Sequence, residues 1–219
     1  MIRLSIALLV VTCVGTGCAS GVARRLYVLG TPLESMETEA SGPVVWLRRV
    51  SLPDYLDSTD IVWRAGLHGL QTSPTGRWGE RLSLGVTQAL ATDLMARLPQ
   101  DRVVWSDPGR QKSTRELLVD VEGFDAWPDG HCVLSATWTL TDPTNSAVLG
   151  GARETFTAAP ARGEAQSDVR VVAGMADVLG KLADSIASAA AARHLTRQDH
   201  AHRPSDSRYG INPGETLRQ

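Results

Sequence analysis

Two alternating stretches joined by a tight turn constrain the fold of this chain most strongly. Residues 117–122 and 132–140 alternate their side chains with a period of two, the pattern of a β-strand that presents one face to a core. Pro128-Asp129-Gly130 stands between them and favours a turn, because proline presets φ and glycine accepts positive φ. The two stretches therefore predict an antiparallel hairpin. A third strand, predicted over residues 148–158, extends the hairpin into a meander.

Shorter strands are predicted in the first half of the chain. Pro53 marks the end of one of them, because proline cannot donate a hydrogen bond to a sheet. Gly66 and Gly69 indicate a second hairpin, and Ser73-Pro74-Thr75-Gly76 is typical of a loop. The predicted strands cover residues 24–29, 44–50, 61–64 and 103–105.

Two stretches show helical periodicity. The first has apolar residues at intervals of four and ends by Pro99; the second begins at Asp168, a suitable N-cap residue, and runs to Arg193. Together with the strands, they predict an α/β (α+β) sandwich with a mixed, largely antiparallel curved sheet and two long amphipathic helices mainly on one face. The apolar positions are Leu82, Val86, Leu90, Leu94 and Leu98 in the first helix, and Val172, Met175, Leu179, Leu182, Ile186 and Ala189 in the second.

Composition limits the number of domains and the class of partner. With 219 residues and 42% hydrophobic residues, the chain can bury one sizeable core. The 22 basic and 24 acidic residues give a net charge of −2, so nucleic acid is not an expected partner. Three cysteines do not make a disulfide framework, and Cys132 is expected to be a buried or half-buried small hydrophobe.

The N-terminus has the features of an export signal that ends in a lipid-attachment site. Arg3 precedes an uncharged run over residues 4–14, which is shorter than the roughly 20 apolar residues of a membrane-spanning helix. Gly15-Thr16-Gly17 then stands directly before Cys18, the pattern of a bacterial lipobox. We therefore expect residues 1–17 to be a signal peptide and Cys18 to become the acylated N-terminus. A plain secreted protein with an incidental cysteine is the alternative.

The rest of the chain divides into one domain and a tail. We expect the domain to cover residues 18–193, and residues 194–219, which have few apolar side chains, to be disordered. Attached fatty acyl chains such as palmitate hold a protein on a membrane without a spanning segment. Ala19 and Ser20 follow the cysteine where inner-membrane lipoproteins carry aspartate, which favours the periplasmic face of the outer membrane.

The sequence offers no recognisable catalytic or metal-binding motif. It contains no Gly-x-Ser-x-Gly pentapeptide and no phosphate-binding loop, and its five histidines lack partners at metal-ligand spacing. We therefore expect neither an enzyme nor a metal site, and no cofactor apart from the covalent lipid on Cys18.

Three segments carry a resemblance to a known family. Leu52-Pro53-Asp54-Tyr55-Leu56-Asp57 is followed by Ile61-Val62-Trp63-Arg64 and then by Trp78-Gly79-Glu80-Arg81-Leu82. With the lipobox, this order resembles the PqiC-type ABC transport auxiliary lipoproteins, which are associated with MCE-domain lipid transport systems. The resemblance covers roughly residues 18–193. Ser58 and Gly79 depart from residues common in the family.

The resemblance implies a non-enzymatic, outer-membrane-anchored subunit of an MCE/ABC-type intermembrane lipid transport system that contributes to envelope integrity. Its implied partner is the periplasm-spanning MCE-domain protein of the same system. We hypothesise that one surface docks this partner or mediates assembly of a homo-oligomer; the alternative is that the turn in this surface only packs on the core. The candidate residues are Leu52, Pro53, Tyr55, Asp57, Arg64 and Trp78.

Two other functions remain open at this stage. One is a general envelope-assembly lipoprotein that binds a different protein. The other is a stand-alone periplasmic lipid carrier, which needs an apolar pocket of several hundred Å³.

Overall fold

A computed structural model describes residues 24–30, 42–106, 113–160 and 167–201. The predicted signal peptide, Cys18 and residues 202–219 lie outside this described part. The strands are β1 (Arg25–Tyr27), β2 (Val44–Leu47), β3 (Asp60–Ala65), β4 (Gly69–Trp78), β5 (Arg102–Val104), β6 (Arg115–Ala126), β7 (Cys132–Asp142) and β8 (Ala147–Ala158), and the helices are α1 (Leu82–Arg97) and α2 (Ser167–Ala201).

The predicted meander forms the centre of a five-stranded sheet. Its strand order is β5-β2-β6-β7-β8, with antiparallel pairing among β6, β7 and β8 and parallel pairing of β2 to both β5 and β6. Gly130, in the turn between β6 and β7, has a φ of 88°, as the Pro-Asp-Gly sequence predicts. The hairpin prediction is therefore confirmed.

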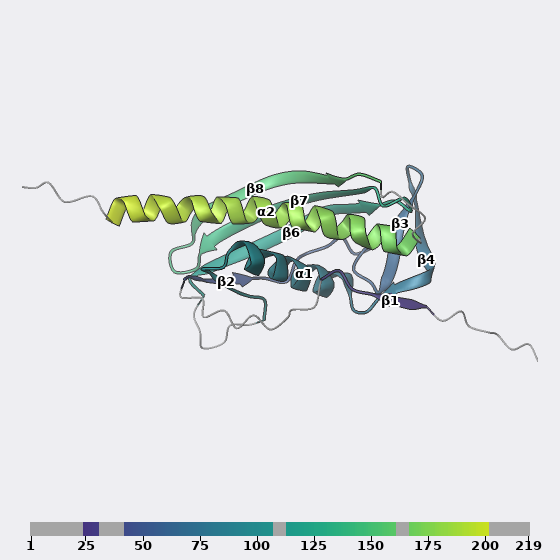
Figure 1. Cartoon of the computed structure of the whole chain (residues 1–219), viewed down its shortest axis with the longest axis horizontal. Coiled ribbons are helices and arrows are strands. Elements are labelled where there is room, and N and C mark those ends of the chain that lie inside the picture. The colour runs from purple at the N-terminus through teal and green to yellow at the C-terminus, as the bar shows by residue number, and fades with distance from the viewer. Residues whose placement is uncertain (1–23, 31–41, 107–112, 161–166, 202–219) are drawn as a thin grey trace, which may run out of the picture.

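Both helices cover one face of this sheet (Figure 1). Along β6 the side chains of Leu117, Val119 and Val121 are buried, whereas the residues between them are exposed or half-buried. Helix α2 packs on β6, β7 and β8, and α1 lies beside α2. The predicted α+β architecture with helices on one face is confirmed.

The sheet prediction needs one correction, because β1, β3 and β4 form a separate three-stranded sheet in the order β1-β4-β3. The loop predicted at residues 73–76 is also wrong, since β4 runs through it. Ser73 does act locally as a turn residue, its Oγ accepting hydrogen bonds from the amides of Thr75 and Gly76 at 3.1 and 2.8 Å. The strand persists because its first half pairs with β3 and its last three residues pair with β1.

Helix α2 is longer than the apolar pattern predicts. It continues past Arg193 to Ala201, so the first part of the predicted disordered tail is helical. Residues 194–201 contain no proline or glycine, and Pro204 is the first residue after Arg193 that opposes a helix strongly. A helix can therefore continue where the apolar stripe has ended.

Asp168 lies in the first turn of α2 and not before it. Its carboxylate is buried and accepts a hydrogen bond from the Thr75 hydroxyl at 2.7 Å. This contact joins the start of α2 to the three-stranded sheet. In Figure 1 that sheet, which includes β1, lies at one end of the elongated molecule, and the C-terminal end of α2 lies at the other.

Candidate functional site

The turn over residues 52–57 connects β2 to β3 and is anchored at its centre. The amides of Leu56 and Asp57 donate hydrogen bonds to the Pro53 carbonyl at 2.9 and 3.3 Å. Leu56 is only 4% exposed, and Leu52 packs half-buried against the core. Leu52 and Leu56 therefore pack the turn onto the core.

Asp57 has a structural partner in α1. Its carboxylate accepts hydrogen bonds from the Ser83 amide and from the Arg81 guanidinium, each at 3.1 Å. Arg81, the residue before the helix, supplies no side-chain cap, so Asp57 provides the missing acceptor from a distant position in the sequence. Burial alone would raise the pKa of Asp57, but the hydrogen bonds from Ser83 and Arg81 outweigh it and hold that pKa below its ordinary value.

Tyr55 points outward from the same turn and meets two charged residues. Arg64 on β3 donates a hydrogen bond through Nε to Oδ1 of Asp125 on β6 at 2.7 Å. Tyr55 is 43% exposed, and the side chains of Arg64 and Asp125 are 25% and 27% exposed. We call these three residues the Tyr55 cluster; it joins the turn, the three-stranded sheet and the five-stranded sheet.

The two charged groups act in opposite directions on the Tyr55 phenol. Burial raises the pKa of Tyr55 above its ordinary value, the negative charge of Asp125 raises it further, and Arg64 opposes the increase. The hydrogen bond to Asp125 raises the pKa of Arg64. At neutral pH the cluster therefore presents a neutral phenol beside a fixed ion pair.

The other candidate residues do not belong to this cluster. Trp78 is 4% exposed, its indole N–H has no hydrogen-bond partner in the described part of the chain, and its amide donates to the Thr59 carbonyl at 2.8 Å. It therefore belongs to the core and adds no exposed surface. Pro53 is half-buried beside Tyr55 in the turn, whereas Asp57 is directed at α1.

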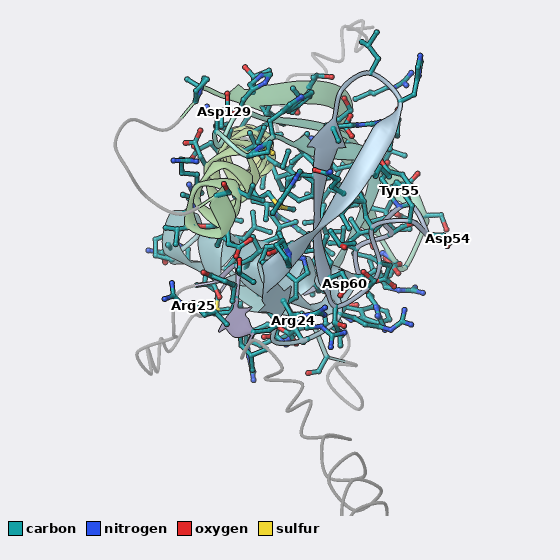
Figure 2. All side chains as sticks on the ribbon, turned by 90° about the vertical axis from the view of Figure 1, so that its right-hand side faces the viewer. Arg24, Arg25, Asp54, Tyr55, Asp60 and Asp129 are labelled. Atoms are coloured by element: carbon teal, nitrogen blue, oxygen red, sulfur yellow. The ribbon has the colours of Figure 1, made fainter. Side chains whose placement is uncertain are left out.

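The sequence did not indicate Asp125. It lies 61 positions after Arg64, and its place near the end of an alternating strand has no special pattern. The two residues come together only because β3 contacts β6 in the folded chain. In Figure 2, which looks onto the end of the molecule at β1, Tyr55 and Asp54 lie on the flank of the three-stranded sheet.

The chemistry of the Tyr55 cluster suits recognition of another molecule. A partly exposed phenol beside a guanidinium offers a flat apolar ring, hydrogen-bond donors and an acceptor at one place. Tyrosine and arginine are the residue types enriched at the centres of protein interfaces. No described group of three His, Cys, Asp or Glu side chains is arranged to hold a metal ion.

A small surface pocket lies between β1, the end of β4 and the start of α1. Tyr27, Leu29, Trp78 and Leu82 contribute to its lining, and its volume of about 10 Å³ has room for roughly one water molecule. Pockets for drug-sized ligands enclose roughly 300–1,000 Å³, so this pocket is too small for a lipid. Neither helix of the described part is long and apolar enough to span a membrane.

Comparison with known proteins identifies a family and a fold. The model of the family described as "ABC-type transport auxiliary lipoprotein component" matches residues 27–187. A crystal structure of an uncharacterised protein superposes with a TM-score of 0.59 at 21% identity, covering 76% of this chain and 97% of that protein. A protein from Xanthomonas campestris superposes with a TM-score of 0.59 at 14% identity, covering 81% of this chain and 98% of its own. No curated protein matches the chain significantly in sequence.

Proposed function

Because this chain belongs to the family of ABC-type transport auxiliary lipoprotein components, we propose that it is anchored by Cys18 to the periplasmic face of the outer membrane. There it serves as a non-enzymatic subunit of an MCE-type intermembrane lipid transport system. Its task is to meet the periplasm-spanning MCE-domain protein close to the outer membrane. The observation that carries the proposal is the family match over residues 27–187, which includes the three segments that carry the resemblance.

The Tyr55 cluster supports a docking role within this proposal. Tyr55 and Arg64 come from two of the resembling segments, and folding places both at the surface with Asp125 as a third member. An ion pair held at 2.7 Å in a partly exposed position fixes the guanidinium in one orientation. We propose that this orientation, with the phenol beside it, forms the contact with the MCE-domain partner.

The pocket beside Trp78 gives no support to a stand-alone lipid carrier. A carrier must enclose much of an acyl chain, and the volume of this pocket is only about 10 Å³. A subunit that completes a path formed mainly by its partner has no such requirement.

The proposal is tested by affinity capture of the lipidated protein from gently solubilised envelope, with partners identified by mass spectrometry. Recovery of an MCE-domain protein is the expected result. A Cys18→Ser variant controls for the anchor and should leave the outer-membrane fraction. Recovery of only cell-wall or assembly proteins, from a well-expressed bait in the outer membrane, would support the general envelope-assembly function instead.

The role of the Tyr55 cluster is tested by Arg64→Ala and Tyr55→Ala in the same capture experiment. Arg48→Ala is the matched control, because Arg48 also donates to a carboxylate at 2.7 Å, that of Glu116, near the other end of β6. We expect loss of partner recovery in the two cluster variants and unchanged recovery in the control. Full recovery in both cluster variants, with unchanged melting temperatures, would exclude the cluster as the docking contact.

A further inference from the structure

The outer face of the three-stranded sheet is uncovered and carries exposed apolar side chains. Arg24, Leu26 and Val28 alternate outward along β1 and its flanks, and Leu26 and Val28 are 72% and 61% exposed. Leu26 pairs with Arg77 of β4, and Arg77 pairs with Asp60 of β3, so these three side chains share one face. Ile61 and Trp63 of β3 are buried on the opposite face.

The hairpin between β3 and β4 adds a protruding apolar residue. Gly66 has a φ of 82° and has open space around it, which allows the chain to reverse in the short tip before Gly69. Leu67 at the tip is 88% exposed, and Leu70, on the first part of β4, is 43% exposed. A tip that presents one large aliphatic side chain offers too little area for a stable protein contact.

The N-terminal chain connects this same end of the molecule to Cys18. Residues 19–23 separate Cys18 from Arg24, and a fully extended chain of this length spans at most roughly 20 Å. In Figure 1 the three-stranded sheet forms the end of the molecule at β1, while α2 extends toward the other end. If the Cys18 lipid lies in a membrane, the three-stranded sheet is held close to that membrane.

The charge on this face also fits a lipid surface. The Asp60 carboxylate lies 3.4 Å from the Arg77 guanidinium and 4.0 Å from that of Arg24. One negative charge is therefore shared by two positive charges, and the three groups together carry a net positive charge. Figure 2 shows Arg24 and Asp60 together at one edge of this end, away from Tyr55 on the flank. A face with excess positive charge and protruding aliphatic side chains can bind anionic headgroups and the upper acyl region together.

We propose that the outer face of the three-stranded sheet, including the Leu67 tip, rests on the lipid surface that holds the Cys18 anchor. This inference builds on the anchoring in the proposed function. It gives the protein a defined orientation: Leu26, Val28 and Leu67 contact lipid, and α2 is directed away from the membrane. Tyr55 then remains accessible on the flank of this end, where a protein partner can reach it.

The test places a polarity-sensitive fluorophore on the lipidated full chain in vesicles of phosphatidylethanolamine and phosphatidylglycerol. Leu67→Cys carries the probe, and Val148→Cys is the matched control, because Val148 is 65% exposed at the start of β8 in the other sheet. Cys132 is buried and burial raises its thiol pKa to about 12, so it should remain unlabelled in the folded protein.

We expect the probe at position 67, but not at 148, to shift its emission to shorter wavelength and to lose most of its quenching by aqueous iodide. Equal quenching at both positions in protein that floats with the vesicles would overturn the lipid contact while leaving the anchor intact. Failure of the lipidated protein to float would instead overturn the anchoring. If the probe at position 67 is protected from iodide quenching even without vesicles, the face contacts a second copy of the chain. That result would also overturn the proposal.

Discussion

Asp57 illustrates how one side chain can support two elements that are distant in sequence. It ends the turn at residues 53–57 and also caps α1, which begins at Leu82. The resemblance places it in a candidate partner surface, but the structure directs its carboxylate at the Ser83 amide and at Arg81. Its hydrogen bonds therefore predict a contribution to stability.

Asp57→Ala should lower the free energy of unfolding by about 1 kcal/mol, the usual cost of losing a helix cap. Thermal unfolding at neutral pH measures this loss. Asp54→Ala is the control, because Asp54 is exposed in the same turn. Asp57→Asn, which keeps an acceptor oxygen, should recover part of the loss; equal melting temperatures for all variants would contradict the cap.

The capping contribution should also depend on pH. The pKa of Asp57 is lower in the folded state than in the unfolded chain, so its contribution is complete above the ordinary carboxylate pKa. It is lost as the pH falls through the lowered folded-state pKa. The stability difference between the wild type and Asp57→Ala should therefore shrink on acidification. A difference that grows toward acidic pH would contradict the assigned pKa direction.

Tyr55 provides a direct test of the cluster at the residue scale. Arg64→Ala should raise the Tyr55 pKa further because it removes a positive charge that lowers it, whereas Asp125→Asn should lower that pKa. Absorbance titration of the phenolate measures both shifts. The chain has three tyrosines, so the spectrum of Tyr55→Phe must be subtracted to isolate Tyr55. Shifts of the same sign in the two variants would contradict the geometry.

At the scale of elements, local patterns predicted well where one face of an element is buried. The alternation in β6 and β7 and the intervals of four in α1 arise from burial against a core, so the sequence records them directly. Ser73-Pro74-Thr75-Gly76 misled because its composition favours a turn, whereas the pairing of residues 69–72 with β3 and of residues 76–78 with β1 keeps the segment between them extended. Pairing partners so distant in sequence leave no local signal.

The contact between α2 and the turn from β6 to β7 predicts an unusual effect of glycine replacement. Alanine is normally about 1 kcal/mol better than glycine within a helix. At Gly174, however, a Cβ would lie 2.2 Å from the carbonyl oxygen of Gly130. Gly174→Ala should therefore lower the melting temperature, because the helix must move away from the sheet.

Gly180→Ala is the matched control in the same helix. A Cβ at Gly180 would meet only the flexible end of Arg97, at 3.4 Å, so this variant should keep or raise the melting temperature. Calorimetry measures the melting temperatures of Gly174→Ala and Gly180→Ala in otherwise identical proteins. A higher melting temperature for Gly174→Ala would show that α2 lies farther from the turn.

At the scale of the whole molecule, burial along α2 sets the extent of the described core. Among the described side chains of α2, the buried ones extend to Ala190, and Ala191 and Ala192 are exposed. Truncation after Arg193 should therefore shift the melting temperature by less than about 2 °C, since changes outside a core usually cost under about 0.5 kcal/mol. A large loss of stability would place residues after 193 within the folded domain.

The sequence by itself determined the period of most elements and the segments that resemble the family, and it predicts an export signal over residues 1–17. Periodicity and motifs are properties of neighbouring residues, so they can be detected without knowing the fold. Only the tertiary structure decided that the strands divide into two sheets, that Trp78 is buried, and that Asp125 completes the pair with Arg64. These outcomes depend on packing between segments far apart in the chain, because burial and charge pairing are set by the residues that folding brings together.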